Sequence, residues 1–265
     1  MDIKSYVAFR KEELFNEIKG FETKPTLVII QANNNPASDA YVRGKIKDAL
    51  EIGANPILDK LDPSITQEKL IEVINKYNND PAVDGIIVQL PLEKHIDENV
   101  IKNSVAKEKD VDGFHPLTEF IPCTPKGIID YLDYNGVTFQ GKNAVVLGRS
   151  NIVGKPMAKL LLSKNCNVTV LHSKTSEDDK AFYLAHADII VVAIGRLGFL
   201  DDRFIYKPSA IIVDVGINRG EDGKLHGDAV PNLPVVIQTP VPGGVGLLTR
   251  IALMGNLVLA YKKRK

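Results

Sequence analysis

The 265-residue sequence predicts an α/β fold made of two α/β domains. Short apolar runs rich in Val, Ile and Leu alternate with longer amphipathic segments along most of the chain. Strands separated by helices in this way are typical of a parallel sheet covered on both faces. The alternation stops near residues 116–142, where one capped helix is expected, and then restarts. We therefore expect domains over residues 1–118 and 119–265, with a cleft between them.

Each expected element has a local signal in the sequence. The expected strands are TLVIIQ (26–31), DGIIVQL (84–90), NAVVLG (143–148), NVTVLH (167–172), ADIIVVAIG (187–195), AIIVDVG (210–216) and VVIQT (235–239). The expected helices cover 36 to about 53, 67–77, 97–105, the segment after Pro122, 153–163, 177–186 and about 245–263. Thr124 as a cap, Pro125 at the first helical position and Gly136 as the stop predict the helix between the domains. The sequence leaves open whether the last helix packs back onto the first domain.

Composition argues against several classes of protein. Lys plus Arg and Asp plus Glu both number 33, so no net charge favours nucleic acid or an anionic membrane as partner. No apolar run is expected to reach the roughly 18–20 residues that cross a bilayer. The charged N-terminus does not resemble a signal peptide. The two cysteines predict buried, reduced thiols in a cytoplasmic protein, and the spacing of the five histidines predicts no metal site.

A nucleotide-binding turn is predicted within VVLGRSNIVGKPMAKLLL, residues 145–162. Gly148 would stand at the sharp exit from a strand, and Gly154 where the next helix packs closely against it. Ser150 occupies the place of the usual middle glycine. Backbone N–H groups at the start of such a helix point toward an anion. The position of the motif favours a phosphate site over an ordinary tight connection.

The following strand indicates which dinucleotide is bound. In NAD-binding units an acidic residue commonly ends this strand and binds the ribose 2′-hydroxyl. Here HSKT (172–175) follows, which offers donors and no carboxylate that would repel a 2′-phosphate. Arg149 can supply a guanidinium from the first turn. These residues favour NADP over NAD, although HSKT also fits a plain polar loop.

Polar residues in the first half of the chain suggest acid–base chemistry. Tyr41 and Lys45 are four residues apart and share one helical face, at the border of an apolar stripe. A lysine on such a border can be partly desolvated and serve as a base or proton relay. Gln89 follows a buried strand at the edge where ligands of parallel sheets gather. Taken alone, Tyr41 and Lys45 are better explained as a half-buried tyrosine beside a surface lysine.

Two further segments suggest a ligand site. In EKDVDGFHP (108–116), Asp112 can pair with an N–H-rich heterocycle, because a carboxylate accepts two parallel hydrogen bonds. Asp-Gly alone is only a turn signal. In TPVPGGVGLLT (239–249), prolines stiffen the chain, while Gly243 and Gly244 allow a backbone to approach a ligand closely. This second segment suits a loop that lines a cleft.

Eight stretches, in order, resemble the bifunctional methylenetetrahydrofolate dehydrogenase/methenyltetrahydrofolate cyclohydrolase family. They are PASDAYVRGK, DGIIVQLPL, KDVDGF, PCTPKG, GRSNIVGKP, HSKT, VDVGINR and TPVPGGVG. The resemblance implies a folate-binding N-terminal domain, a Rossmann-type NADP-binding domain and a homodimer. It implies an oxidoreductase that converts 5,10-methylenetetrahydrofolate to the 5,10-methenyl form with NADP⁺. It also implies a hydrolase that converts this form to 10-formyltetrahydrofolate, within one-carbon metabolism and purine biosynthesis.

The resemblance also implies roles for individual residues. Lys45 resembles the central catalytic residue, with Gln89 beside it. Tyr41 resembles the aromatic that stacks on folate, and Asp112 the anchor of the pterin ring, so both join the catalytic set. The residues that fall on the family's cofactor contacts are Gly148, Arg149, Ser150, Ser173 and Ile217. Those that fall in its substrate-binding loop are Gly243 and Gly244.

The chain departs from the family's usual pattern near these residues. Leu247 and Leu248 replace Pro-Met after GGVG, Glu93 replaces a second proline after QLPL, and Leu257 follows Asn256 where threonine is usual. These changes leave the expected catalytic set intact. They bear on the shape of the substrate loop.

Two other functions are compatible with parts of the sequence. A shikimate-dehydrogenase-like NADP oxidoreductase also pairs an α/β substrate domain with a cofactor domain. It would have a glycine-richer turn than GRSNIVG, and it gives no reason for KDVDGF or TPVPGGVG. A non-catalytic NADP- or folate-sensing module would be favoured by loss of the lysine, but Lys45 is present.

Overall fold

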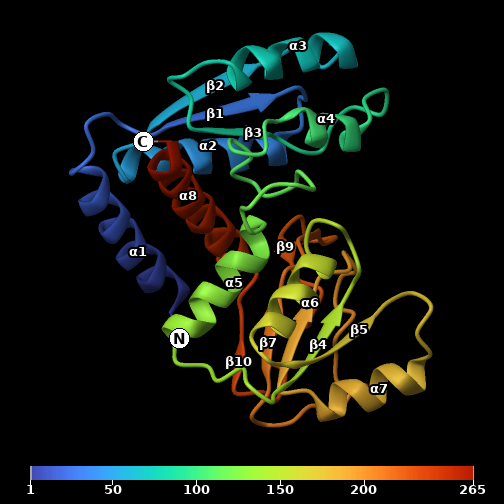
Figure 1. Cartoon of the computed structure of the whole chain (residues 1–265). Coiled ribbons are helices and arrows are strands. Elements are labelled where there is room, and N and C mark those ends of the chain that lie inside the picture. The colour runs from blue at the N-terminus through green and yellow to red at the C-terminus, as the bar shows by residue number, and fades with distance from the viewer. Residues whose placement is uncertain (1, 265) are drawn as a thin grey trace. The chain divides into compact units, whose positions relative to one another are not determined.

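The computed structural model of the chain describes residues 2–264 and divides into two compact units (Figure 1). The N-terminal unit holds Val7–Cys123 together with the residues from Arg250 onward. The C-terminal unit holds Thr124–Thr249 and the residues up to Tyr6. The divisions therefore fall inside two helices, α1 (Ile3–Ile18) and α8 (Val245–Arg264), and at the start of α5 (Cys123–Tyr134). Most of the last helix thus belongs with the first half of the chain.

The N-terminal unit contains a three-stranded parallel sheet in the order β2-β1-β3. Its strands and helices are β1 (Thr26–Gln31), α2 (Pro36–Glu51), β2 (Asn55–Lys60), α3 (Gln67–Asn78), β3 (Gly85–Val88) and α4 (Glu98–Ser104). Every residue of β1 and β3 is buried, as expected of strands covered on both faces. Val28 and Ile30 of β1 share a core with Leu70 and Ile74 of α3. The side chain of Asn35 caps α2, because its oxygen accepts a hydrogen bond from the Ala37 N–H.

The C-terminal unit contains a five-stranded parallel sheet in the order β10-β7-β6-β4-β5. Its principal elements are β4 (Asn143–Leu147), α6 (Gly154–Ser163), β5 (Asn167–Leu171), α7 (Glu177–His186), β6 (Ile189–Val192), β7 (Ile211–Asp214) and β10 (Ile237–Gln238). A short antiparallel hairpin, β8 (Asn218–Arg219) and β9 (Leu225–His226), follows β7. The sheet's core face includes Val145, Ile190 and Ile212 from three neighbouring strands. The predicted parallel α/β fold is confirmed.

Four elements were not anticipated from the sequence: α1, β2 and the two hairpin strands β8 and β9. In α1, charged residues interrupt the apolar ones, although Ile3, Val7 and Ile18 are buried at helical spacing. In β2, NPILDK is exposed or half-buried along its length, so it lacks the apolar run of a central strand. Its Pro56 is tolerated because β2 lies at the edge of the sheet. The hairpin strands are only two residues each and leave no periodic signal.

We expected no segment to be long and apolar enough to cross a membrane. This expectation was wrong, because α8 meets both criteria by its length and composition. Within α8, one window reaches a mean hydropathy of 1.3. Thr249, Arg250 and Asn256 interrupt the apolar residues, so the sequence shows no continuous apolar run here. However, 61% of the window is buried inside the structure, as in a core helix of a folded protein.

Asn256 ties α8 to the loop that precedes α5. Its side chain is 1% exposed, and its Nδ2 donates to the carbonyl oxygens of Val111 (3.0 Å) and Ile121 (3.1 Å). Val111 directly precedes Asp112, and Ile121 lies two residues before Cys123. The asparagine thus satisfies two loop carbonyls that have no strand partner.

Replacing Asn256 with Ala is expected to lower the free energy of unfolding by about 1–2 kcal/mol, because the Val111 and Ile121 carbonyls lose a buried amide donor, while Val111 keeps the hydrogen bond from Cys123 Sγ. Urea unfolding of the purified chain measures this change. Leu259→Ala, at a 41% exposed position of the same helix, is the control and should cost less. Equal losses in the two variants would show that the amide hydrogen bonds are not the source.

Candidate functional site

Lys45 lies inside the buried face of α2, not at its border. Only 4% of the lysine is exposed, and Ser38, Val42 and Ala49 are buried along the same helical stripe. The interpretation as a surface lysine is therefore wrong. A buried ammonium or amine needs polar partners, since desolvation without them is costly.

Gln89 provides that partner. Lys45 Nζ donates to Gln89 Oε1 at 3.1 Å, and Gln89 is itself buried. The glutamine follows directly after β3, and its backbone N–H extends the sheet by donating to the Ile30 carbonyl at 2.8 Å. Its Nε2 donates to the Leu90 carbonyl at 2.6 Å, which turns Oε1 toward the lysine. The structure thus brings together two residues that are 44 positions apart.

Tyr41 completes this cluster one helical turn before Lys45. Lys45 Nζ lies 5.1 Å from the centre of the half-buried Tyr41 ring. At this distance the ring face attracts the cation. One aromatic face, one amine and one amide therefore stand side by side in the N-terminal unit.

The structure adds Asn33, which the sequence did not single out. Its Nδ2 donates to the Pro91 carbonyl at 2.8 Å, and the Ser38 hydroxyl donates to the Leu90 carbonyl at 3.4 Å. Both bonds hold the segment that follows Gln89. The polar run QANNNPAS carries no spacing that would indicate this contact, because its partner lies more than 50 residues later.

Asp112 lies in the same unit and is half-buried. It shares a small cavity of about 20 Å³ with Leu90, Phe114 and Lys102. Burial raises the pKa of the nearby Cys123 thiol; the Asp112 carboxylate raises it further, while Lys45 acts in the opposite direction. Both charged groups therefore lie within electrostatic range of one thiol. Asp112 and the Lys45 cluster border the same region.

Asp110 shapes the loop that carries Asp112. Its carboxylate accepts hydrogen bonds from the backbone N–H groups of Gly113 (3.2 Å) and His115 (2.6 Å). Burial raises the pKa of Asp110 to about 6. The hydrogen bond from His115 opposes the increase, and the neighbouring Asp112 carboxylate adds to it.

In the C-terminal unit, the predicted nucleotide-binding turn has the expected geometry. Gly148 directly follows β4 and has φ +113°, and a Cβ there would stand 2.3 Å from the Ala193 carbonyl oxygen. A Cβ on Gly154 would stand 2.3 Å from the Gly148 carbonyl oxygen. Both positions thus exclude any side chain. Ser150 occupies the place of the usual middle glycine, and its side chain supports the turn. Its Oγ accepts hydrogen bonds from the backbone N–H groups of Val153 and Gly154.

Arg149 and Ser173 line one cavity of about 290 Å³. Both side chains are exposed at its rim. The remaining residues of HSKT are partly engaged locally: Thr175 Oγ1 accepts from the His172 N–H, and His172 Nδ1 accepts from the Lys174 N–H. Lys180, Arg196 and Phe199 line the same cavity. Sequence reasoning missed these three because they come from segments without a recognisable motif.

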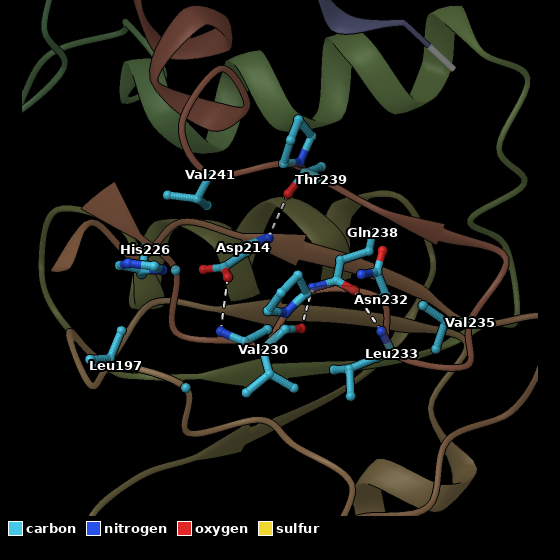
Figure 2. Close-up of a pocket in the computed structure, with 15 residues that line it drawn as sticks. Leu197, Asp214, His226, Val230, Asn232, Leu233, Val235, Gln238, Thr239 and Val241 are labelled. Carbon is cyan, nitrogen blue, oxygen red and sulfur yellow. Dashed lines mark hydrogen bonds between the residues drawn. The ribbon is translucent and has the colours of Figure 1, made fainter. Parts of the chain in front are cut away.

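Two buried aspartates fix the loops that surround these residues. Asp214, at the end of β7, accepts from the Asp228 and Ala229 N–H groups. Its own N–H donates to Thr239 Oγ1 at 2.8 Å (Figure 2). Asp228 accepts from Asn218 Nδ2 at 2.9 Å, next to the exposed Ile217. The predicted cofactor residue Ile217 therefore stands on a loop held at one end by a buried carboxylate.

A separate cavity of about 680 Å³ lies beside Asp214 and Thr239 (Figure 2). None of the predicted site residues lines it. Gln238 at its wall is engaged at both ends, with the Leu233 N–H and the Val230 carbonyl. The cavity therefore offers few free polar groups, and we assign no ligand to it.

The two glycines of the predicted substrate loop, Gly243 and Gly244, lie in the C-terminal unit. Gly243 has φ +91°, and a Cβ on Gly244 would stand 2.1 Å from the Pro240 carbonyl oxygen, so this loop also requires glycine. Across residues 2–264, no group of three or more His, Cys, Asp or Glu side chains is placed to hold a metal ion.

Comparison with known proteins identifies the family. Residues 1–112 match the tetrahydrofolate dehydrogenase/cyclohydrolase catalytic domain, and residues 122–265 match the NAD(P)-binding domain of the same family. The chain belongs to the tetrahydrofolate dehydrogenase/cyclohydrolase family. The resemblance seen in the eight sequence stretches is thereby confirmed.

Individual members of the family are similar over nearly the whole chain. The bifunctional protein FolD of Streptococcus pneumoniae serotype 2 is 51% identical over 243 residues, which are 87% of this chain and 84% of that protein. The crystal structure of bifunctional FolD from Campylobacter jejuni has a TM-score of 0.94 at 40% identity, covering 99% of this chain and 98% of that one. A Trypanosoma brucei FolD structure, complexed with NADP and an inhibitor, has a TM-score of 0.93 at 31% identity, covering 99% and 97%.

Asp110, in the loop that carries Asp112, makes the stability of the folded chain depend on pH. Since its pKa is raised from 3.8 to about 6, the folded chain binds a proton that the unfolded chain has lost between these pH values. Its contribution to the free energy of unfolding therefore falls as pH rises through this window. Carbon-13 NMR should show the Asp110 carboxyl titrating near pH 6.

Asp112→Asn is the informative companion variant. It removes the neighbouring carboxylate, so the Asp110 midpoint should move to lower pH. Asp97, an exposed helix cap in the same unit, is the matched carboxylate for comparison: Asp97→Asn should leave the midpoint unchanged. A wild-type midpoint near 4 would contradict the effect of burial.

Proposed function

We propose that this chain oxidises 5,10-methylenetetrahydrofolate to 5,10-methenyltetrahydrofolate with NADP⁺ and hydrolyses the product to 10-formyltetrahydrofolate. One observation carries the proposal: a buried lysine amine, hydrogen-bonded to Gln89 and set beside an aromatic ring, in a chain that belongs to this family throughout. Relatives named bifunctional, at up to 51% identity, support both activities.

The C-terminal unit fits a dinucleotide. Any Cβ at Gly148 or Gly154 would collide with the backbone, and α6 begins at this turn, where the N–H groups of Val153 and Gly154 bind Ser150 Oγ. Arg149 and Ser173 line the adjoining cavity without a carboxylate among its lining residues. When bound, NADP⁺ would supply the hydride acceptor. The proposed contacts of the cofactor are Gly148, Arg149, Ser150, Ser173 and Ile217.

In the oxidation, the protein's task is alignment. Loss of hydride from the carbon that bridges N5 and N10 leaves a cation stabilised by both nitrogens, so no strong base is needed. Tyr41 would stack on the folate ring system, and Asp112 would accept two hydrogen bonds from the pterin. Gly243 and Gly244 would allow close approach of the backbone to the substrate.

In the hydrolysis, a proton must be moved. Water that attacks the methenyl carbon loses a proton as the carbon–oxygen bond forms, and a base within reach accelerates this step. The bond from that carbon to N5 then breaks as N5 takes up a proton and the carbinol oxygen loses its own, which leaves the formyl group on N10. Lys45 is the amine placed for this role in the cluster, and Gln89 orients it through the 3.1 Å hydrogen bond. The two reactions therefore make different demands on one lysine.

The alternative functions have less support. A shikimate-dehydrogenase-like activity does not account for a family match that covers residues 1–112 and 122–265. A non-catalytic sensing module gives no reason to bury an amine against an amide beside an aromatic ring. The bifunctional folate enzyme accounts for both observations.

We also propose a cytoplasmic location and a domain division that follows the sequence. Cys123 and Cys166 are buried and free, which suits a reducing compartment. Folate binding is assigned to residues 1–118 and NADP binding to 119–265, with the residues of α8 from Arg250 counted with the first domain.

A homodimer is the proposed assembly. Strand β5 ends the five-stranded sheet, so its outer row of backbone N–H and C=O groups has no strand partner among the described residues. Val170 on this strand is 36% exposed. An edge of this kind can pair with the same edge of a second copy about a two-fold axis. Sedimentation equilibrium should give twice the chain mass of 29.1 kDa, and a value near 29.1 kDa would exclude the dimer.

The proposed activity is tested by following the two products separately. The purified chain is incubated with 5,10-methylenetetrahydrofolate and either NADP⁺ or NAD⁺, and methenyl- and formyl-tetrahydrofolate are quantified over time. NADP⁺ should support faster oxidation than NAD⁺, and both products should appear. Absence of oxidation with either cofactor would overturn the proposal.

Lys45→Met separates the two steps. It keeps the apolar stem and removes the amine, so cyclohydrolase turnover should fall by roughly 10²-fold or more, at least as severely as the dehydrogenase turnover. Lys47→Met, at a 74% exposed side chain on the same helix, is the matched control and should keep both activities. Full cyclohydrolase turnover in Lys45→Met would remove the lysine from the mechanism.

A further inference from the structure

We propose that Arg196 is a second guanidinium that reads the 2′-phosphate of the cofactor and so contributes to the preference for NADP. The inference rests on the proposed function, because it concerns the same dinucleotide site. Arg196 lies in AIGRLG, a segment without a nucleotide-binding motif. Its role comes from where the fold places it.

Three strand ends form the cavity that contains Arg196. Gly148 and Arg149 follow β4, Ser173 follows β5, and Arg196 follows β6, and all four line the cavity of about 290 Å³. In a dinucleotide-binding sheet, the pyrophosphate lies at the glycine turn after the first strand, and the adenosine ribose lies near the end of the second. Since Arg196 shares a cavity with Ser173, it lies at the adenosine end of the site.

The backbone at Arg196 is held by a buried carboxylate. Asp228, which is fully buried, accepts hydrogen bonds from the N–H groups of Ile194 (2.7 Å), Gly195 (2.9 Å) and Arg196 (2.8 Å). Three successive N–H groups on one carboxylate fix the turn after β6. The arginine therefore projects from a preorganised position, which reduces the entropy lost when it binds a ligand.

The guanidinium lies against the wall of the cavity. Its Cζ is 4.9 Å from the centre of the Phe199 ring, and Phe199 also lines the cavity. Stacking on an aromatic face leaves the edge of a guanidinium, with its N–H donors, free to bind an anion. Within residues 2–264, Arg196 and Arg149 make no ion pair, so both charges remain available.

The charge balance of the cavity favours a dianion. Three cations line it, namely Arg149, Lys180 and Arg196, and no carboxylate does. Lys180 is already paired with Glu177, whose carboxylate also lies within electrostatic range of Arg196, and neither guanidinium forms an ion pair among the described residues. A phosphate monoester carries about two negative charges and accepts bidentate hydrogen bonds from arginine. The 2′-phosphate is the group of the cofactor with this chemistry at the adenosine end.

The test measures binding of two small probes by isothermal titration calorimetry. Adenosine 2′,5′-bisphosphate and adenosine 5′-monophosphate differ only in the 2′-phosphate. Arg196→Ala should weaken binding of the bisphosphate by roughly 10- to 100-fold, the range for one charge-assisted hydrogen-bonding group. Binding of the monophosphate should change by less than about 2-fold. Arg196→Lys, which keeps the charge but not the planar fork, should fall between wild type and Ala.

Arg203→Ala is the matched control. Arg203 also lies over a phenylalanine, 5.7 Å from the centre of Phe204, but it pairs with Asp201 and does not line the cavity. It should leave both affinities unchanged. The Arg196 side chain is exposed, so thermal unfolding of Arg196→Ala should match wild type and exclude misfolding as the cause.

Each contrary outcome has a distinct meaning. Equal weakening of both probes would show that Arg196 contacts adenine or ribose, which overturns the assignment. Unchanged affinities in Arg196→Ala, with wild type still preferring the bisphosphate, would overturn the role of Arg196 alone. If wild type bound both probes equally, the proposed use of NADP would fail and the assignment with it.

Discussion

Parallel pairing is the constraint on which the site residues depend. Every strand in the three-stranded and the five-stranded sheet runs parallel to its neighbours. All carboxyl ends of a sheet therefore meet at one edge, and the loops that follow them lie close together. Asn33 and Gln89 meet in this way in the N-terminal unit, and Lys45 reaches Gln89 from helix α2. Arg149, Ser173 and Arg196 do so in the C-terminal unit.

Such an edge leaves many backbone groups without strand partners, and polar side chains satisfy them. Asp228 and Asp214 each accept several N–H groups in the C-terminal unit. In the N-terminal unit, Asn33 and Asn256 donate to loop carbonyls. A buried polar group without a partner costs about 1–3 kcal/mol, so these side chains make irregular loops compatible with a folded core. The loops are then rigid enough to present functional groups at defined positions.

The buried lysine illustrates how function opposes stability. Lys45 occupies a position on α2 where its neighbours Val42 and Ala49 are apolar core residues. An apolar residue there would avoid the desolvation of the amine. The hydrogen bond to Gln89 and the contact with the Tyr41 ring offset part of that cost. The arrangement is explained by chemistry at the amine, since packing alone does not require it.

The sequence by itself determined the fold class, most of the elements and the family. Apolar runs, caps and glycine turns are local signals, because they depend on residues within about one helical turn or one strand. It did not determine that Lys45 is fully buried, that Asn33 supports Gln89, or that Arg196 joins Arg149. Weakly patterned elements such as α1 and β2 were also hidden, because their burial comes from neighbours elsewhere in the chain. Only the tertiary structure decided these points, since each depends on segments that meet in space and leave no periodic signal in the sequence.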